Sequence, residues 1–254
     1  MSKIKNILFL LIFLSVFAVS CSKYNQYAKV ETSIIKVDSA NVPVDDSASI
    51  AMIKPYKDQL DAQMNEIIGT TEEPFMKGTP EGLLGNFVAD LSLIMANSHN
   101  SETEKVDFCI MNAGGLRTPL PKGAIKKSKV FELMPFENEL VVLTLSGEKT
   151  YEMFQFIAKK GGIPVSGFSM GIKDTFAVNI KVGDLVFDKI KNYRIVTSDY
   201  LANGGDKMAF FKDPIKRVSL NLKVRDAILE YMAEETKKGN KLKSKLDKRI
   251  YFEK

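Results

Sequence analysis

The chain has 254 residues, of which 45% are hydrophobic and 26% are charged. This length and balance exclude a disordered or fibrous protein and are typical of a globular protein with one main domain. The formal net charge of +5 falls by two, to +3, if Lys3 and Lys5 leave with an export signal. So small an excess of positive charge does not indicate nucleic acid as a partner.

The first twenty residues are predicted to be an export signal. Lys3 and Lys5 precede an apolar run from Ile7 to Val19, which is shorter than the ~20 residues that a membrane-spanning helix needs. Small residues then lead to Cys21, and this end resembles a bacterial lipoprotein signal. The resemblance implies that residues 1–20 are removed and that Cys21 carries a lipid. We therefore expect a membrane-anchored protein of the cell envelope, on the periplasmic side or at the cell surface. A plain secretory signal with an incidental cysteine is the alternative.

The segment after the signal, residues 21–46, mixes Ser, Thr, Asp and Val without sustained periodicity, which predicts a tether with one short strand near Ser33. Residues 47–254 are expected to form the main domain. The chain has two cysteines, so Cys109 has no disulfide partner if Cys21 carries a lipid. Cys109 lies in an apolar run and is predicted to be a small buried hydrophobe rather than a nucleophile.

Four helices are predicted in the main domain from apolar residues at three- and four-residue steps. Asp46 or the next residue caps the first helix, and Gly69 ends it. Thr79 caps the second, with Pro80 at its first helical position, and Ser146 caps the third. The four apolar faces are Ile53, Tyr56, Leu60, Met64, Ile67 and Ile68; Leu84, Phe87, Val88, Leu91, Ile94 and Met95; Tyr151, Phe154, Ile157 and Ala158; and Val224, Ala227, Ile228, Tyr231 and Met232.

Strands are predicted where apolar residues alternate with polar ones or form short runs. These segments are Val106 to Met111, Glu139 to Leu145, Ile163 to Ile172, Phe176 to Val182 and Tyr193 to Ser198. The helices do not alternate regularly with the strands, and most of the strands lie within hairpin range of one another. The pattern therefore predicts an α+β fold, a mixed sheet packed by helices, rather than a doubly wound sheet.

Four segments combine polar groups with glycine or proline in a way that core packing alone does not explain. They are Gly85-Asn86, Asn112-Ala-Gly-Gly-Leu-Arg117, Leu133-Met-Pro-Phe-Glu-Asn138 and Ser198-Asp-Tyr-Leu-Ala-Asn-Gly-Gly-Asp206. In the second segment, glycines after a strand let the backbone approach a ligand closely. The guanidinium of Arg117 can bind carboxylates, phosphates or paired hydroxyls through two parallel hydrogen bonds. This segment therefore predicts a ligand-binding corner.

The side chains of these segments suit a planar ring attached to a polyol. Phe136 and Tyr200 supply aromatic faces, and stacking on a nucleobase contributes about 1–3 kcal/mol per base. Asn112 and Arg117 supply directional polar groups, and the carboxylate of Asp206 can accept from both hydroxyls of a ribose. A nucleoside or nucleotide is thus the ligand that these residues predict.

At these residues the chain resembles the C-terminal, substrate-recognition domain of the 5′-nucleotidase family, which includes bacterial periplasmic UDP-sugar hydrolases and the animal ecto-5′-nucleotidase. The resemblance covers residues 69–213 and keeps the order and similar spacing of five motifs. These are Gly85-Asn-Phe-Val-Ala-Asp90, Asn112-Ala-Gly-Gly-Leu-Arg117, Leu133-Met-Pro-Phe136, Val165-Ser-Gly167 and Tyr200-Leu-Ala-Asn-Gly-Gly-Asp206.

The resemblance implies a role for each site residue. Phe136 and Tyr200 would enclose the base, Asn112 would meet its edge, Asp206 would hold the ribose hydroxyls, and Arg117 would lie toward the ribose or phosphate. Gly114 and Gly167, which stand in two of the motifs, are counted with these substrate-binding residues. Family members often have phenylalanine where this chain has Tyr200, so the chain adds a hydroxyl there. Lys77 is the basic residue available upstream of the first motif.

The resemblance also implies what this chain lacks. Enzymes of the family cut phosphate esters with a separate N-terminal metallophosphoesterase domain, whose two metal ions need several His, Asp and Asn ligands. This chain has one histidine, His99, which is predicted to be an exposed residue at a helix end. Ser166 and Ser198 have no histidine placed to activate them. We therefore expect no catalytic residue, cofactor or metal in this chain, and divalent metals only on a separate catalytic chain.

Three hypotheses remain open from the sequence. The chain is the nucleotide-recognition subunit of a split 5′-nucleotidase that works with a separate metallophosphoesterase chain, or a lipoprotein that binds nucleosides or nucleotides without catalysis, or a scaffold whose pocket is vestigial.

Overall fold

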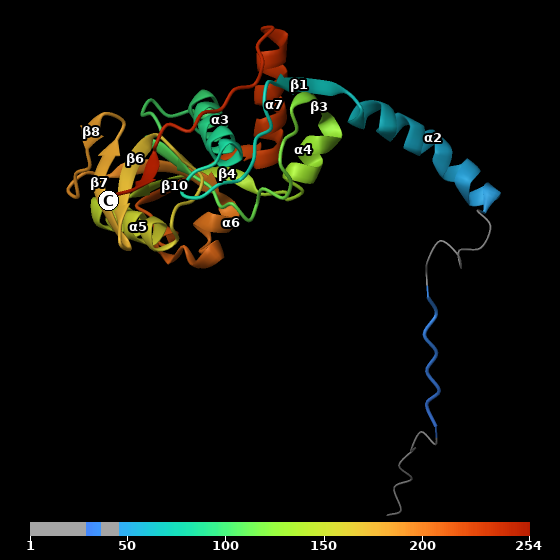
Figure 1. The fold of residues 1–254 in the computed structure, drawn as a ribbon, viewed down its shortest axis with the longest axis horizontal. Helices are drawn as coiled ribbons and strands as arrows, with labels where there is room; N and C mark the ends of the chain where they lie inside the picture. The colour runs from blue at the N-terminus through green and yellow to red at the C-terminus, as the bar shows by residue number, and fades with distance from the viewer. Residues whose placement is uncertain (1–28, 37–45) are drawn as a thin grey trace, which may run out of the picture. The chain divides into compact units, whose positions relative to one another are not determined.

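The computed structural model describes residues 29–36 and 46–254 (Figure 1). The predicted signal at residues 1–20, the predicted lipidation site Cys21 and much of the predicted tether lie outside the described residues. The described chain divides into two parts at Met52, and each is treated by itself. Residues 29–36 form neither helix nor strand, so the short strand expected near Ser33 is not found there. No helix in the described ranges is long and apolar enough to cross a membrane.

The first helix, α2, spans Ser47–Met64, and none of its side chains is buried. Asp46 caps it as predicted, because its Oδ1 accepts from the backbone N–H of Ala48 at 3.1 Å. The expectation that it continues to Ile68 is wrong. Ile67 and Ile68 belong instead to the strand β1, where they pair with a distant strand and Ile68 is buried. Cross-strand pairing and burial of a β-branched residue thus override the helical spacing.

The remaining elements are packed into the second part of the chain. In order they are β1 (Ile67–Thr71), α3 (Leu83–His99), β2 (Phe108–Ile110), β3 (Gly123–Lys126), α4 (Lys127–Leu133), β4 (Glu139–Leu145), α5 (Gly147–Lys159), β5 (Val165–Ser166), β6 (Phe168–Lys173), β7 (Phe176–Val182), β8 (Leu185–Val186), β9 (Tyr193–Ser198), α6 (Asp199–Ala202), two 3₁₀ turns (Gly205–Lys207 and Ala209–Phe211), β10 (Lys216–Lys223), α7 (Val224–Lys237) and β11 (Ile250–Phe252).

A five-stranded mixed sheet in the order β10-β4-β9-β2-β5 forms the centre of this part. β4 pairs antiparallel with β10 and β9, whereas β2 runs parallel to β9. Two further sheets flank it, one of β1 and β3 and one in the order β11-β6-β7-β8. The predicted α+β fold with a mixed sheet packed by helices is therefore confirmed.

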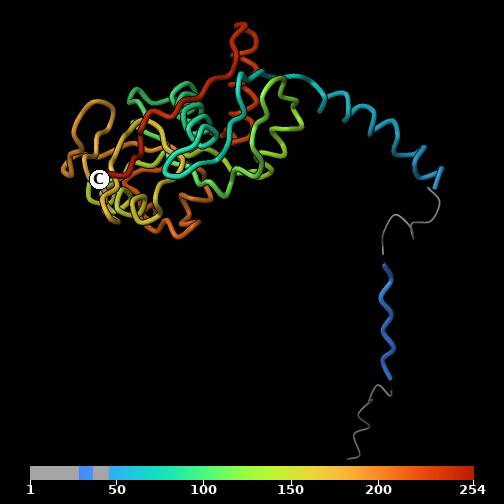
Figure 2. The backbone as a smooth tube through the Cα atoms, in the orientation of Figure 1, coloured from blue at the N-terminus to red at the C-terminus, as the bar shows by residue number. Residues whose placement is uncertain are grey.

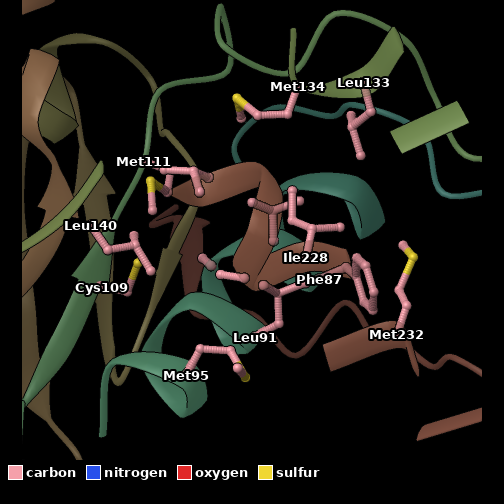
Figure 3. Packing of buried hydrophobic residues seen from close by; sticks show 14 of the residues in the cluster. Phe87, Leu91, Met95, Cys109, Met111, Leu133, Met134, Leu140, Ile228 and Met232 are labelled. Carbon is pink, nitrogen blue, oxygen red and sulfur yellow. The ribbon is translucent and has the colours of Figure 1, made fainter. Parts of the chain in front are cut away.

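Each face of the central sheet covers its own hydrophobic core, and β4 shows why. Its side chains alternate in direction, so that Leu140 and Val142 face α3 while Val141 and Leu143 face α5. The α3 core includes Phe87, Leu91, Met95, Cys109, Leu140, Ile228 and Met232, several of which lie side by side in Figure 3. The α5 core includes Phe108, Ile110, Val141, Leu143, Phe154, Ile157, Phe168 and Ile195.

Cys109 is fully buried in the α3 core, as predicted. Burial raises the pKa of its thiol well above the usual value, because the thiolate would lose its hydration there. A buried thiol with a raised pKa is a poor nucleophile. Cys109 therefore serves packing rather than chemistry.

The C-terminal segment, residues 238–254, returns over the beginning of α3 to reach the sheet of β11, β6, β7 and β8, called the second sheet below (Figure 2). Ser244 Oγ donates to the backbone oxygen of Leu83 at 2.7 Å, and the carboxamide of Asn86 donates to that of Lys245 at 2.8 Å. β11 then pairs in parallel with β6. The segment thus spans both flanks of the domain.

Several boundaries differ from the sequence predictions, among them those of β2, which spans Phe108–Ile110 rather than Val106–Met111. α3 begins at Leu83 with Gly82 as its N-cap, so Thr79 and Pro80, joined by a cis peptide bond, lie in the loop before it. The strand expected from residues 163–172 is divided at Gly167, whose φ of 87° turns the chain from β5 into β6. The third helix is as expected, because Ser146 Oγ accepts from the N–H of Lys149.

Candidate functional site

A hollow of about 430 Å³ opens where the loop after β2, the turn after α4 and the segment after β9 meet. Its size lies within the range of small-molecule sites. The residues that line it are Asn112, Gly114, Gly115, Arg117, Phe136, Asn138, Tyr200 and Asp206. Six of the seven residues predicted as substrate-binding are therefore brought together here from distant parts of the chain.

The loop after β2 turns tightly, so that its polar groups reach the hollow. The N–H of Gly115 donates to the backbone oxygen of Asn112 at 3.3 Å, which closes the turn. A Cβ on Gly115 would lie 3.0 Å from Asn112 Oδ1, so glycine leaves room for that carboxamide. Arg117 Nη1 donates to the oxygen of Gly114 at 3.2 Å, and its side chain is exposed. The guanidinium is thus oriented by the loop yet remains open to a ligand.

The turn after α4 presents Phe136 at the rim. Phe136 is 41% exposed, in contrast to the fully buried Phe154 of the α5 core. The neighbouring Glu137 anchors the turn, because its carboxylate accepts from Lys223 and from Arg225. The Arg225 guanidinium also lies 4.5 Å from the centre of the Phe131 ring. This network fixes the backbone on which Phe136 stands.

The same two cations shift the ionisation of Glu137. Hydrogen bonds from Lys223 and then from Arg225 lower the pKa of this carboxyl to about 2. Both donors favour the charged form of Glu137. The anchor is therefore ionised at neutral pH.

The segment after β9 carries the carboxylate of the site. α6 begins with Ser198 as its cap, whose hydroxyl accepts from the N–H of Leu201 at 3.3 Å. Tyr200 on this helix is 45% exposed, and its hydroxyl donates to Asp206 Oδ1 at 2.9 Å. Asn112 Nδ2 donates to the other oxygen, Oδ2, at 2.6 Å. Asp206 is thus held from two sides.

This arrangement offers two exposed rings, one cation and one carboxylate around a single hollow. Each oxygen of the Asp206 carboxylate accepts one protein hydrogen bond, and a carboxylate has about four acceptor positions. It can therefore take two more donors from a ligand. The rings of Phe136 and Tyr200 can stack on a planar group. A planar ring attached to a polyol with neighbouring hydroxyls fits these groups.

The other chemistry-bearing residues take structural positions. His99 is the last residue of α3, as predicted, and its Nε2 lies 3.0 Å from Glu230 Oε1. Asp90 lies within α3, in the helix predicted around it, and its carboxylate accepts from Arg249 at 2.6 Å. Over the described part of the chain, no three His, Cys, Asp or Glu side chains group so as to hold a metal ion.

Three of the residues considered from the sequence lie elsewhere. Gly167 is not among the residues that line the hollow; its Cβ would lie 2.5 Å from the backbone oxygen of Asp107, so it serves the close approach of β2. Asn86 is buried and donates to Glu81 Oε2 at 2.9 Å, which makes this motif a packing feature. Lys77 also lies outside this lining, in a narrow crevice beside Gly85.

Two lining residues, Gly115 and Asn138, were not chosen from the sequence. Both stand inside segments that the sequence singled out, next to Gly114 and two residues after Phe136. Their positions within these polar segments are the sequence signal that could have identified them as lining residues.

A second hollow of about 310 Å³ adjoins the first, and Asn112 and Asp206 line both. The bonded pair therefore borders both hollows. The other residues of the second hollow are Ala113, Phe156, Lys160, Ile163, Lys207 and Met208.

Comparison with known proteins gives a consistent result. The family model described as 5′-nucleotidase, C-terminal domain, matches residues 67–213. A trifunctional nucleotide phosphoesterase of Bacillus subtilis is 28% identical over 87% of this chain and 17% of its own length. A 5′-nucleotidase of Vibrio parahaemolyticus is 27% identical over 63% of this chain and 29% of its own length.

Two solved structures share the fold. A 5′-nucleotidase precursor from Thermus thermophilus matches with a TM-score of 0.67 and 23% identity, over 82% of this chain and 43% of that one. The NAD nucleotidase of Haemophilus influenzae matches with a TM-score of 0.64 and 19% identity, over 82% of this chain and 41% of that one. The chain thus spans less than half the length of each of these four proteins.

Proposed function

The chain belongs to the 5′-nucleotidase C-terminal domain family, and from this premise we propose that it is the nucleotide-recognition subunit of a split 5′-nucleotidase. It binds the base and ribose of a nucleoside or nucleotide, and a separately encoded metallophosphoesterase chain hydrolyses the phosphate ester. The observation that carries the proposal is the convergence of Arg117, Phe136, Tyr200 and Asp206 on one hollow.

Each group has a defined part in binding. The base stacks between the rings of Phe136 and Tyr200, which contributes about 1–3 kcal/mol. The free acceptor positions of Asp206 take the ribose hydroxyls. Asn112 uses one N–H on Asp206, so its Oδ1 and second N–H are left for the edge of the base. The guanidinium of Arg117 lies toward the ribose or phosphate, where it adds a charge-assisted hydrogen bond.

Hydrolysis is assigned to the partner chain for a chemical reason. Phosphate-ester cleavage by this family rests on two metal ions, and the described residues of this chain offer no cluster of three metal ligands. The divalent metals would therefore be held by the partner. The exposed face around Arg117 and Tyr200 is where the bound phosphate would meet that chain.

Anchoring to a membrane of the cell envelope belongs to the same proposal. It rests on the sequence of residues 1–20 and on Cys21, which by its resemblance to lipoprotein signals would carry the lipid. An anchor at the N-terminal end would keep the recognition subunit beside a partner in the same compartment. Metabolic labelling with a fatty acid tests it: the wild type should incorporate label and Cys21→Ser should not.

Calorimetric titration of the mature chain with adenosine, AMP and UDP-glucose tests ligand binding. We expect saturable binding of at least one of the three. Asp206→Ala should weaken it by about 1–3 kcal/mol, the loss for removing one partner of a charged hydrogen bond. Asp184→Ala, which removes an exposed carboxylate between β7 and β8, is the matched control and should bind as the wild type does. Silence of the wild type with all three ligands would favour the vestigial scaffold.

Mixing the chain with a candidate metallophosphoesterase chain tests the catalytic part. The mixture should hydrolyse AMP faster than either chain alone, and Asp206→Ala should reduce the gain at low AMP concentration. Ligand binding without any gain would leave the alternative, a binding lipoprotein that takes no part in catalysis.

A further inference from the structure

Asp206 stands in a backbone conformation that ordinary residues avoid. Its φ of 51° and ψ of 25° are left-handed, and Lys207 beside it has a φ of 68°. In this region the Cβ of a residue other than glycine crowds its own backbone, so the conformation needs support from its surroundings. The direction of the Asp206 carboxylate therefore depends on the contacts that hold this turn.

One hydroxyl holds both the backbone and the side chain of Asp206. The N–H of Asp206 donates to Tyr200 Oη at 3.3 Å, and Tyr200 Oη donates to Asp206 Oδ1 at 2.9 Å. The hydroxyl thus acts as acceptor and donor to the same residue. A phenylalanine at position 200 would keep the ring and lose both bonds.

The Tyr200 ring packs against the backbone of Gly205. A Cβ at position 205 would lie 2.5, 2.6 and 2.7 Å from three carbons of that ring, closer than atoms in contact can approach. The glycine therefore lets the ring lie flat against the turn, and from this position its hydroxyl reaches Asp206. Packing and hydrogen bonds therefore join Tyr200, Gly205 and Asp206 in one turn.

The hydrogen bonds from Tyr200 and Asn112 leave part of the Asp206 carboxylate free to accept from a ligand. Tyr200 occupies one acceptor position on Oδ1, and Asn112 occupies one on Oδ2 at 2.6 Å. One position remains on each oxygen. Two acceptors on neighbouring oxygens match the two neighbouring hydroxyls of a ribose, whereas a 2′-deoxyribose offers only one hydroxyl to this pair.

We propose that Tyr200 is a positioning residue that sets sugar specificity, because its hydroxyl fixes the Asp206 carboxylate to accept both hydroxyls of a ribose. This inference rests on the proposed nucleoside site. It assigns to the hydroxyl a role separate from stacking, which the ring performs. The chain then prefers ribonucleosides to deoxyribonucleosides more strongly than a variant with phenylalanine at this position.

The test compares Tyr200→Phe with the wild type in calorimetric titrations with adenosine and 2′,3′-dideoxyadenosine. The two ligands share a base and differ only in the sugar hydroxyls. The variant should bind adenosine about tenfold more weakly, the scale of a hydrogen bond to a charged group. Its affinity for dideoxyadenosine should stay within about twofold of the wild type, because stacking is unchanged. Tyr251→Phe, on β11 in the second sheet, is the matched control.

A double-mutant cycle separates positioning from a general loss of structure. If Tyr200 acts through Asp206, Tyr200→Phe should cost nothing further for adenosine once Asp206→Ala is present. Equal weakening of both nucleosides by Tyr200→Phe, or an unchanged ratio between them, would overturn the inference while the proposed function stands. Failure of the wild type to bind either nucleoside would overturn the inference, and failure to bind AMP and UDP-glucose as well would overturn the proposed function too.

Discussion

Glu137 shows how one charged residue can support a candidate binding surface that it does not itself line. Its carboxylate accepts from Lys223 and Arg225, two residues at the junction of β10 and α7, and Phe136 precedes it in the chain. The aromatic ring at the rim of the hollow is therefore placed by ion pairs more than eighty residues away in sequence. Loss of these ion pairs should first loosen the turn after α4 that carries Phe136.

The pH dependence of stability tests this anchor. The folded pKa of Glu137 is lowered from 4.5 to about 2, so its contribution is fully present above pH 4.5 and is lost as the pH falls toward 2. In urea unfolding, the wild type should be more stable than Glu137→Gln near pH 6, and this difference should vanish near pH 2. Glu132→Gln, on the neighbouring helix α4, is the control for the change in charge. A difference that persists at pH 2 would contradict the electrostatic account.

At the scale of elements, apolar spacing predicts a helix but not what the helix packs against. Leu60 on α2 and Leu91 on α3 both recur at helical spacing, yet Leu60 is 53% exposed and Leu91 is 1% exposed. Leu91→Ala should lower the free energy of unfolding by about 2–5 kcal/mol, because it opens a cavity in the α3 core. Leu60→Ala should change it by less than about 0.5 kcal/mol. Urea unfolding of both variants measures the contrast, and equal losses would mean that α2 is packed in solution.

How far sequence could predict the elements depends on where each strand finds its partner. β4, β7 and β9 have the predicted bounds, because each carries a long alternating or apolar run of its own. β1 and β3 were not predicted, since they are short and stabilised by pairing with each other across more than fifty residues. β10 and β11 likewise depend on partners distant in sequence. Local pattern carries no information on such pairing.

The residues of the candidate site were easier to predict than the strand pairing, because each has a signal in the sequence immediately around it. Asn112, Phe136 and Asp206 each stand in a segment where glycine or proline breaks an apolar pattern, and such breaks fall at the loops where ligands bind. What the sequence could not give is the hydrogen bonding among them. The contact from Tyr200 Oη to Asp206 depends on the left-handed turn, which only the folded backbone shows.

At the scale of the whole domain, the C-terminal segment joins the two flanks of the central sheet. Arg249, just before β11, donates to Asp90 of α3 at 2.6 and 3.1 Å, to Asp247 at 2.8 and 3.0 Å, and to the backbone oxygen of Val165 at 2.8 Å. Its side chain is 8% exposed. A planar guanidinium can make all these bonds at once, whereas a lysine cannot. The residue thus links α3, β5 and the strand that extends the second sheet.

Arg249→Met should therefore weaken the domain as a unit. The substitution leaves two carboxylates side by side and the Val165 oxygen without its donor, and we expect a loss of about 2–3 kcal/mol in the free energy of unfolding. The loss is kept moderate because Asp90 and Asp247 retain access to water, with side chains 37% and 30% exposed. Arg217→Met, which removes an exposed guanidinium bonded to Asn203, should change stability by less than about 0.5 kcal/mol. Urea unfolding followed by circular dichroism measures both variants. If Arg249→Met unfolds at the same urea concentration as the wild type, the contacts of the C-terminal segment do not contribute to the stability of the domain. A single unfolding transition at lower urea would show that the segment couples the two cores.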